Sequence, residues 1–475
     1  MKYILYIVFI SIIIGSCRKD DVFTNAPVSL NFSTDSVNFD TIFSLKDSGV
    51  IGTPRSVTLK LIVTNPNENA VKTTISLEGK DKQGIFKINA DGIPGSGNLQ
   101  KIENLEIRGK DSIYVFIQSY IKPDVFDEFQ VIDNVLFNTN GNLQKVVALT
   151  YAMNANYFKN DTISVDETWQ GSKPYVIYDD LFIKPGVTLT INPGVKIHSH
   201  NNSTIYVWGT LKILGTVDNP VVLQGDRLGV DYSEVPNQWN GIHFLQSSVN
   251  NKIQGAIIKN GFVGVRVDSV SLNGNPKLEL SQTIIQDMGA VGLLSYSAYV
   301  KADNNLISDC GQYTFLGDLG GRYDFTFNTF SAIGSSAARK NATFTITNTP
   351  YRNQSGAIIM AFPLSYNLRN NIIWGSNEDE INFVRDEQGV TINTNVKNNN
   401  IKSTLFRDEL IQSTSKIDKN QVNYDPLFVD YIKKNYKLKG GSICTGAAET
   451  GTSITVDLAN KFRSFSPTIG AYEPE

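Results

Sequence analysis

The chain of 475 residues is poor in the side chains that most often build metal and redox centres. It holds three Cys, three His and four Trp. Nothing has the spacing of a zinc finger, so a structural zinc module is excluded, and neither a cofactor nor calcium is indicated. Cys310 and Cys444 stand far apart in the sequence. We therefore expect two buried thiols, although export would permit a disulfide between them.

An excess of charge of one sign is also missing. The chain has 43 Lys and Arg against 46 Asp and Glu, for a formal net charge of −3. Without a basic stripe, a nucleic-acid partner is not expected. Helical periodicity of useful length is absent between the apolar segments as well, which argues against βαβ units and for an all-β protein.

The long apolar run of this chain lies at its N-terminus, over residues 3–14. This run is too short for a transmembrane helix but has the length of a secretory signal. The following Ile14-Gly15-Ser16-Cys17 resembles a bacterial lipobox, which implies that Cys17 is acylated. We expect a lipoprotein signal peptide over 1–16 and a lipidated tether over 17–27. Several acyl chains on one residue anchor a protein firmly to a membrane.

The tether begins with Arg18-Lys19-Asp20-Asp21. This run resembles the export tag of surface lipoproteins in the Bacteroidetes. The resemblance implies a protein that is lipid-anchored in the outer membrane and exposed on the cell surface. Retention in the inner leaflet is the alternative.

Residues 28–155 alternate between apolar and polar positions, with turn residues between the runs. Seven short strands are predicted here: Val28–Phe32, Val57–Val63, Thr73–Leu77, Ile85–Ile88, Ile113–Gln118, Val131–Phe137 and Val146–Tyr151. So many strands without a helix favour a β-sandwich. The segment resembles immunoglobulin-like modules of the Hydin type.

A repeat of about two dozen residues dominates the C-terminal half. Its fragments begin at residues 256, 283, 305, 328, 371 and 399. Two columns of apolar residues flank a bend in each fragment, and they are five positions apart. The upstream column is Ile253, Leu280, Ala302, Phe325, Leu368 and Val396, and the downstream column is Ile258, Ile285, Ile307, Phe330, Ile373 and Ile401. A straight strand cannot turn both columns inward, so a bend must lie between them.

Asn is concentrated at this bend. It tolerates the left-handed backbone that a sharp corner needs, and stacked Asn side chains can form hydrogen-bonded ladders. Such a repeat is typical of a solenoid. The long step between residues 328 and 371 leaves room for one extra coil or an insertion.

The repeat resembles the single-stranded right-handed parallel β-helix of the pectin-lyase-like family, over residues 160–475. Lys173–His200, Gln238–Ile242, Tyr424–Phe428 and Ile469–Glu473 are similar to a group of Bacteroidetes β-helix lipoproteins. The expected architecture is therefore a β-sandwich followed by a parallel β-helix. The resemblance carries no enzymatic residues with it.

The outward positions of the repeat carry mixed charge. Lys301, Asp303, Asp324 and Arg369 are expected on one face within a few coils, where a lyase would need a base and a cation. We treat these four as candidate catalytic residues. The alternative is a solvated sheet face with alternating charges. The candidate ligand-binding residues are Trp239, Trp374, Asn367 and Asn395.

Three functions fit this sequence. We favour a cell-surface lipoprotein whose β-helix presents a non-catalytic binding or adhesion face for an extended glycan. A polysaccharide lyase or glycoside hydrolase on the same fold is the first alternative, so whether the chain is an enzyme is left open. A purely structural stalk is the second alternative. The expected partners are a polysaccharide and, through Cys17, the membrane.

Overall fold

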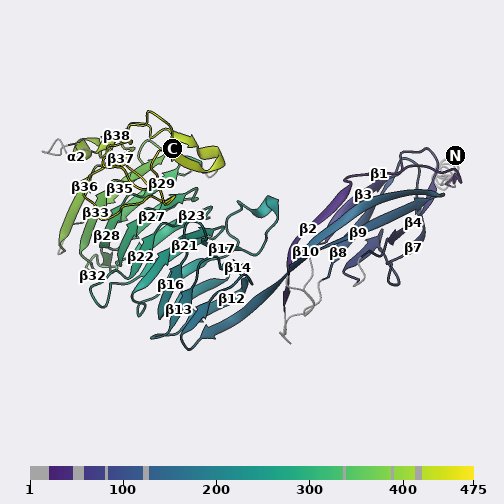
Figure 1. Cartoon of the computed structure of the whole chain (residues 1–475), viewed down its shortest axis with the longest axis horizontal. Coiled ribbons are helices and arrows are strands. Elements are labelled where there is room, and N and C mark those ends of the chain that lie inside the picture. Colours follow the sequence, from purple (N-terminus) through teal and green to yellow (C-terminus); the bar gives the residue numbers. More distant parts are fainter. Residues whose placement is uncertain are drawn as a thin grey trace, which may run out of the picture. The chain divides into compact units, whose positions relative to one another are not determined.

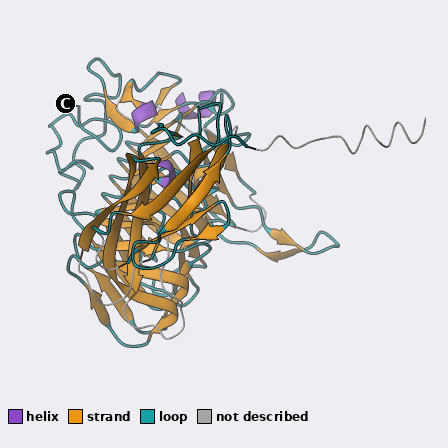
Figure 2. Cartoon of the chain, turned by 90° about the vertical axis from the view of Figure 1, so that its right-hand side faces the viewer, coloured by secondary structure: helices purple, strands orange, loops and turns teal. Residues whose placement is uncertain are grey.

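The computed structural model describes residues 21–45, 58–80, 84–120, 128–334, 339–386, 390–411 and 420–474. Cys17 and the expected signal peptide lie outside the described residues. The chain divides into two compact units between Asn154 and Ala155. Strands are the main regular elements of both units (Figure 1; Figure 2).

The N-terminal unit contains two antiparallel sheets. One sheet has the strand order β1-β3-β8-β5-β6, and the other pairs β7 with β4, β4 with β9, and β9 with β10, which also pairs with β2. The strands are β1 (Asn31–Phe32), β2 (Ser36–Leu45), β3 (Leu59–Thr64), β4 (Val71–Leu77), β5 (Phe86–Ala90), β6 (Ile93–Pro94), β7 (Ile102–Ile107), β8 (Ser112–Ser119), β9 (Glu128–Thr139) and β10 (Asn142–Ile163), of which the part after Asn154 belongs to the C-terminal unit. All seven predicted strands are present, and β2, β6 and β7 were not predicted.

Alternation of side chains along these strands builds one core for the N-terminal unit. In β3 and β4 every second residue is buried, for example Leu61, Val63 and Ile75. These residues belong to a single apolar cluster to which both sheets contribute. The β-sandwich expected from the sequence is therefore observed.

The C-terminal unit is a parallel β-helix with three strand ladders, here called sheets 1, 2 and 3. Sheet 1 contains the first half of β12 (Tyr175–Ile183) with β14 (Lys196–Ser199), β17 (Val221–Gly225), β20 (Ala256–Lys259), β23 (Ile284–Gln286), β26 (Leu306–Ser308), β29 (Thr329–Ala332), β34 (Ile372–Gly375), β37 (Asn400–Ile401) and β38 (Gln421–Val422). Figure 1 shows the strands stacked side by side in layers.

Sheets 2 and 3 complete each coil. Sheet 2 contains the second half of β12 with β15 (Thr204–Val207), β18 (Gly241–Phe244), β21 (Val263–Asp268), β24 (Val291–Tyr296), β27 (Tyr313–Asp318), β30 (Phe344–Thr347) and β35 (Ile381–Val384). Sheet 3 contains β11 (Glu167–Trp169), β13 (Thr188–Ile191), β16 (Thr210–Leu214), β19 (Asn251–Gln254), β22 (Leu278–Ser281), β25 (Tyr299–Asp303), β28 (Gly321–Thr326), β33 (Leu364–Arg369) and β36 (Ile392–Lys397).

Both predicted apolar columns stack in register. Ile253 pairs with Leu280, and the pairing continues coil by coil through sheet 3 to Val396. Ile258 pairs with Ile285, and this column continues through sheet 1 to Ile401. Nearly all of these side chains belong to one apolar core that runs through the coils. The predicted inward columns are therefore confirmed.

The bend between sheets 3 and 1 carries the predicted asparagine ladder. The side-chain oxygen of Asn328 accepts hydrogen bonds from the backbone and side-chain nitrogens of Asn305, at 3.0 and 2.8 Å. Asn328 makes the same pair of bonds to Asn371. The ladder continues through Asn399 to Asn420. Each buried amide is thereby satisfied by its neighbours one coil away.

Two excursions leave the coils. Residues 226–238 form a loop between β17 and β18 with the short 3-10 helix η1 (Val230–Tyr232). The second is a hairpin of β31 (Tyr351–Arg352) and β32 (Ile358–Met360), whose residues are exposed. Phe330 pairs directly with Ile373, so the long step of the repeat contains an insertion and not an extra coil.

Residues 420–474 end the chain as a segment that folds back over the corner between sheets 3 and 1. This C-terminal segment contains β38, β39 (Phe428–Asp430), η2 (Tyr431–Lys433) and β40 (Asn435–Leu438), and it follows the helix α2 (Arg407–Ile411). Its apolar residues cover Leu306, Phe327 and Ile372. Among the described residues, no helix is long and apolar enough to span a membrane. Cys310 and Cys444 are both buried, as predicted.

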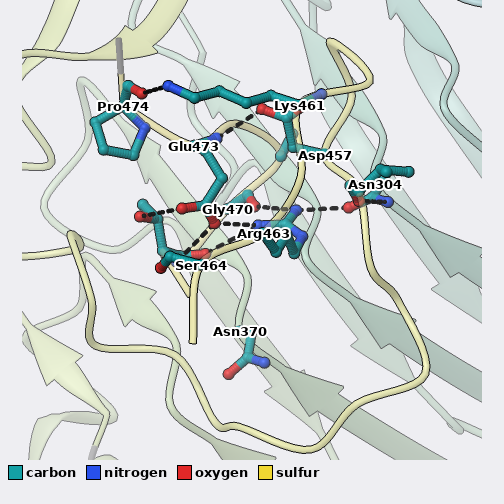
Figure 3. A network of polar contacts seen from close by, with 12 residues as sticks. Asn304, Asn370, Asp457, Lys461, Arg463, Ser464, Gly470, Glu473 and Pro474 are labelled. Atoms are coloured by element: carbon teal, nitrogen blue, oxygen red, sulfur yellow. Dashed lines mark hydrogen bonds and ion pairs between the residues drawn. The ribbon is translucent and has the colours of Figure 1, made fainter. Parts of the chain in front are cut away.

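A buried arginine fastens this segment. Figure 3 shows Arg463 between Glu473, Gly470 and Asn304. Its guanidinium lies 3.0 Å from the Glu473 carboxylate and donates a 2.6 Å hydrogen bond to Asn304. Asp457 accepts bonds from the backbone of Lys461 and of Glu473, so the ends of the segment are held together. We call this arrangement the C-terminal clasp.

Candidate functional site

Aromatic rings gather on the outer surface of sheet 2 at its first coils. Phe182, Tyr206 and His243 are paired in successive strands, and their neighbours along each strand point into the core. By the alternation of a β-strand, these three side chains therefore face outward. Trp208 follows β15 and joins them. The four residues Phe182, Tyr206, Trp208 and His243 are here called the aromatic face, and each is partly exposed.

The rings of the aromatic face form one continuous array. Phe182 and Tyr206 lie with centroids 5.5 Å apart and planes 8° apart, which is a stacked arrangement. Trp208 lies 6.0 Å from each of them. The His243 ring follows 5.6 Å from Tyr206. Coils rise by about 4.8 Å, so register alone places one ring above another. The array offers an apolar surface that also carries the polar atoms of Tyr206, Trp208 and His243.

A charged cluster adjoins the aromatic face at the next coil. The Asp268 carboxylate lies 2.7 Å from His243 Nε2 and accepts two bonds of 2.9 Å from the Arg266 guanidinium. Burial acts to raise the pKa of Asp268, but the bonds from His243 and Arg266 outweigh it and the pKa is lowered. Asp268 is therefore an ionised, fully engaged carboxylate. It holds His243 and Arg266 in place but is poorly suited to donate a proton.

An apolar patch extends the same surface over the following coils. Its members lie on β21, β24 and β27 or directly beside them, and they pack as a cluster outside the main core: Val263, Ala290, Val291, Leu294, Tyr296, Tyr313 and Leu316. The outer surface of sheet 2 therefore continues as a partly apolar strip beyond the charged cluster. Such a strip suits a long ligand better than a compact one.

A second ring column stands on sheet 1, across the bend at Asp179. Tyr178 packs against Tyr157 in a tilted arrangement and stacks on His200, with centroid distances of 5.2 and 4.3 Å. His200 Nδ1 lies 2.7 Å from Asp226, and this hydrogen bond raises the pKa of His200. Aromatic side chains thus line both sides of the corner within β12.

The four candidate catalytic residues do occupy one outer surface, on sheet 3. Lys301 pairs with Asp324 in adjacent strands, and Asp303 lies two residues beyond Lys301 on the same side. The Asp324 carboxylate is bound by Tyr299 at 2.8 Å and by Arg322 at 3.0 Å. Arg369 lies 3.4 Å from Glu449 of the C-terminal segment. Asp324 and Arg369 are therefore already engaged within the protein.

Asp303 has the most perturbed acidity of the four. Burial raises its pKa to about 6, against the opposing charges of Lys301 and Arg369. The Lys301 ammonium lies 3.7 Å away. A carboxyl with this pKa can serve as a general acid, but it needs a second group with a different task nearby. Asp324, bound by Tyr299 and Arg322, is not placed for that task.

The candidate ligand-binding residues comprise two buried tryptophans and two asparagines on the outer surface of sheet 3. Trp239 is 1% exposed and donates a 2.9 Å hydrogen bond to the Lys259 carbonyl. Stacking of Trp239 on a sugar does not fit this burial, because the loop returns the ring to the coil. Asn367 and Asn395 pair on sheet 3 through a 2.7 Å hydrogen bond. Trp374 is 7% exposed and packs on sheet 1 against the C-terminal segment.

Within the described ranges, no group of three or more His, Cys, Asp or Glu residues could hold a metal ion. His198 and His200 lie two residues apart on one side of a strand but in different surroundings. His198 is buried, and burial lowers its pKa to about 4. His200 is engaged by Asp226.

Sequence reasoning did not find the aromatic face as a unit. The sequence predicts neither Trp208 nor His243 as a site residue. The excursion at 226–238 separates Tyr206 from His243 and interrupts the period. The available signal was the alternation in Tyr206-Val207-Trp208 and His243-Phe244, which places the rings opposite the buried residues.

Comparison with known proteins adds little to this geometry. No protein-family model matches the chain. Protein bark beetle of Drosophila melanogaster is 43% identical over 56 residues, which is 12% of this chain and 2% of that protein. The chain thus corresponds to a very small share of that curated relative.

Among solved structures, the catalytic unit of a GH87 alpha-1,3-glucanase from Streptomyces thermodiastaticus is 12% identical, with a TM-score of 0.28, over 73% of this chain and 74% of that one. A family 123 glycoside hydrolase from Clostridium perfringens is 11% identical, with a TM-score of 0.19, over 30% and 31%. Similarities of this size define no activity for this chain.

Proposed function

We propose that the β-helix is a non-catalytic module that binds an extended glycan on the outer surface of sheet 2. One observation carries this proposal: the partly exposed rings of Phe182, Tyr206 and Trp208 form one continuous array across two coils. The carbon-rich parts of a sugar chain pack on such a surface, while the polar atoms of Tyr206 and Trp208 and the neighbouring charged cluster meet its hydroxyl groups.

The electrostatics of the same surface favour binding over catalysis. Asp268 accepts hydrogen bonds from both His243 and Arg266, and its lowered pKa keeps it ionised. A glycosidase needs one carboxyl group that gives up a proton and a second that acts as nucleophile or base. Asp268 stays ionised and is therefore not suited to the first of these tasks.

The proposal is tested by affinity electrophoresis and calorimetry of the full chain against a panel of neutral and acidic polysaccharides. Tyr206→Ala combined with Trp208→Ala removes two of the three rings and is expected to weaken binding at least tenfold, since about 1.4 kcal/mol corresponds to a factor of ten. Tyr351→Ala, on the exposed hairpin, is the matched control and is expected to leave the affinity unchanged.

The enzymatic alternative is decided in the same experiment. Chromatography of the polysaccharide after incubation detects shortened or unsaturated products. No product is expected from the wild type. Product that forms with wild-type protein and disappears with Lys301→Ala would replace the binding proposal with a lyase on sheet 3.

Attachment to a membrane is part of the proposed function. The apolar run over 3–14, the lipobox-like Ile14–Cys17 and the charged residues that follow support a lipid anchor on Cys17 in the outer membrane, exposed on the cell surface. Mass spectrometry of the N-terminal peptide from the membrane fraction is expected to find acylated Cys17. Recovery of Cys17→Ala in the same fraction would contradict an anchor at this residue.

A further inference from the structure

A pocket of about 380 Å³ opens at the last coils of sheet 1, on a different sheet from the aromatic face. Ligand pockets commonly have volumes of about 300–1,000 Å³. Six residues line it: Trp374, Glu378, Lys402, Thr404, Asn423 and Asp425. From this lining we propose that the pocket binds a single neutral sugar unit, such as the end of a glycan chain. This inference goes beyond the proposed function and does not depend on it.

The register of sheet 1 builds this pocket from three consecutive coils. Ile373, Ile401 and Val422 are paired in successive strands and point inward. The residue after each of them therefore points outward, which places Trp374, Lys402 and Asn423 in one row. The turn that follows each strand adds a second lining residue: Glu378, Thr404 and Asp425.

The side chains of Trp374, Lys402 and Asn423 form the base of the pocket and are held by contacts within the protein. The Lys402 ammonium donates a 2.9 Å hydrogen bond to the Gly375 carbonyl and lies 5.5 Å from the centre of the Trp374 ring. Asn423 uses both ends of its amide on the backbone of Ser403, at 2.9 Å each. Trp374 is packed with Phe428 in the C-terminal cluster. These side chains are thus fixed before any ligand arrives, which reduces the ordering cost of binding.

The rim provides the hydrogen-bonding groups. Within the described part of the chain, Glu378 makes no hydrogen bond or ion pair through its exposed carboxylate. Oδ1 of Asp425 accepts a hydrogen bond from the backbone N–H of Leu427. The other carboxylate oxygen, Oδ2, can then accept a hydrogen bond from a ligand. Carboxylate oxygens and the Thr404 hydroxyl suit the hydroxyl groups of a sugar.

The charge of the pocket selects against acidic sugars. Two carboxylates, on Glu378 and Asp425, face one ammonium, on Lys402. A uronate would bring a third carboxylate beside them and would be repelled. A neutral pyranose brings only hydroxyl groups, which can donate to both carboxylates. The Tyr424–Phe428 segment contributes to the pocket in two ways. Asp425 lines it, and Phe428 lies in the same apolar cluster as Trp374.

Saturation-transfer NMR with the full chain tests this inference. The probes are the methyl pyranosides of glucose, galactose and mannose, with glucuronic acid as the acidic counterpart. Transfer to at least one neutral glycoside is expected, with at least tenfold weaker transfer to glucuronic acid. Glu378→Gln combined with Asp425→Asn is expected to weaken neutral binding at least tenfold. Asp408→Asn, an exposed acid of α2, is the matched control and is expected to change nothing.

Two outcomes would overturn the inference. One is the absence of transfer to every neutral probe, and the other is transfer that survives the double substitution. Both rim residues are exposed, so the variants are expected to fold, and a circular dichroism melt checks this. Tyr206→Ala with Trp208→Ala separates the two sites: loss of monosaccharide transfer in that variant would assign the signal to the aromatic face instead.

Discussion

Asparagine has two different tasks at consecutive positions of the bend between sheets 3 and 1. Asn304, Asn370 and Asn398 adopt the left-handed backbone, with φ of 56°, 59° and 52°. The next residue in each coil, such as Asn305, belongs to the buried ladder. A short amide side chain suits both tasks, because it tolerates positive φ and can donate and accept at once.

Loss of one rung is expected to be costly. Asn328→Ala removes the acceptor of the Asn305 backbone N–H and side-chain amide, and a donor to the Ala302 carbonyl. Orphaned buried groups cost about 1–3 kcal/mol each, so a destabilisation of about 3 kcal/mol is expected in a urea titration that follows the C-terminal unit. Asn395→Ala, on the outer surface of sheet 3, is expected to cost less than about 1 kcal/mol.

Asp303 predicts a pH dependence of stability. Its pKa is raised by burial to about 6 in the folded protein, above the unfolded value of about 3.9. The folded state thus binds this proton more tightly, so the associated stability is present below pH 4 and is lost as the pH rises through 6. Asp303→Asn is expected to stabilise the protein by about 3 kcal/mol at pH 8 and hardly at all at pH 4.

Thermal melts of wild type and Asp303→Asn at pH 4, 6 and 8 measure this difference. Equal melting temperatures at all three values would mean that the carboxylate is well compensated by Lys301 and Arg369. A variant that is stabilised at pH 8 but not at pH 4 would show that the buried, charged carboxylate costs the fold free energy.

At the scale of elements, the C-terminal clasp controls how the C-terminal segment covers the corner. The Arg463 and Glu473 side chains are almost completely buried, at 3% and 5% exposure. Arg463→Ala leaves the Glu473 carboxylate buried without its cation, and this is expected to cost about 3–5 kcal/mol. Hydrogen exchange is expected to speed up in β39, β40 and residues 443–471.

Lys461→Ala provides the control for the clasp. Lys461 is exposed and donates to the Pro474 carbonyl at the edge of the same network. Its removal is expected to leave exchange in the segment almost unchanged. If both variants behave alike, the ion pair is not what holds the segment.

The repeat predicted elements well because its signal is periodic. The apolar columns that begin at Ile253 and Ile258 recur at the same positions of each repeat, and every pair that they predict is in register. The clasp could not be predicted in this way. Contacts such as that between Asn304 and Val456 join a repeat to a segment that has no repeat, so no sequence pattern indicates them. The aromatic face was missed for a related reason: the excursion at 226–238 disrupts the period where the rings lie.

The candidate residues of sheet 3 show where sequence reasoning stops. Their placement on one outer face was predicted correctly: Lys301 and Asp324 lie in one row, and Asp303 and Arg369 lie in the next. Their engagement by Tyr299, Arg322 and Glu449 depends on side-chain geometry and on the C-terminal segment, which an alignment of coils does not contain. The repeat predicted on which face these side chains lie. It did not predict that their charged groups are already bound by other residues of the protein.

At the scale of the C-terminal unit, parallel coils convert a linear sequence into a flat outer surface with rows of aligned side chains. One such row carries rings on β12, β15 and β18. A ligand with its own linear repeat can meet several coils at once, so a modest contribution from each ring adds up. This property connects the fold to an extended glycan more directly than to a small substrate.

The most direct measurement is a crystal structure of the full chain with the oligosaccharide that binds most tightly in calorimetry. The account predicts an intact sugar chain whose rings rest on Phe182, Tyr206 and Trp208, with hydroxyl groups toward His243 and Arg266. A sugar chain that lies elsewhere and leaves these rings bare, or a cleaved product bound beside Lys301 and Asp303, would contradict it.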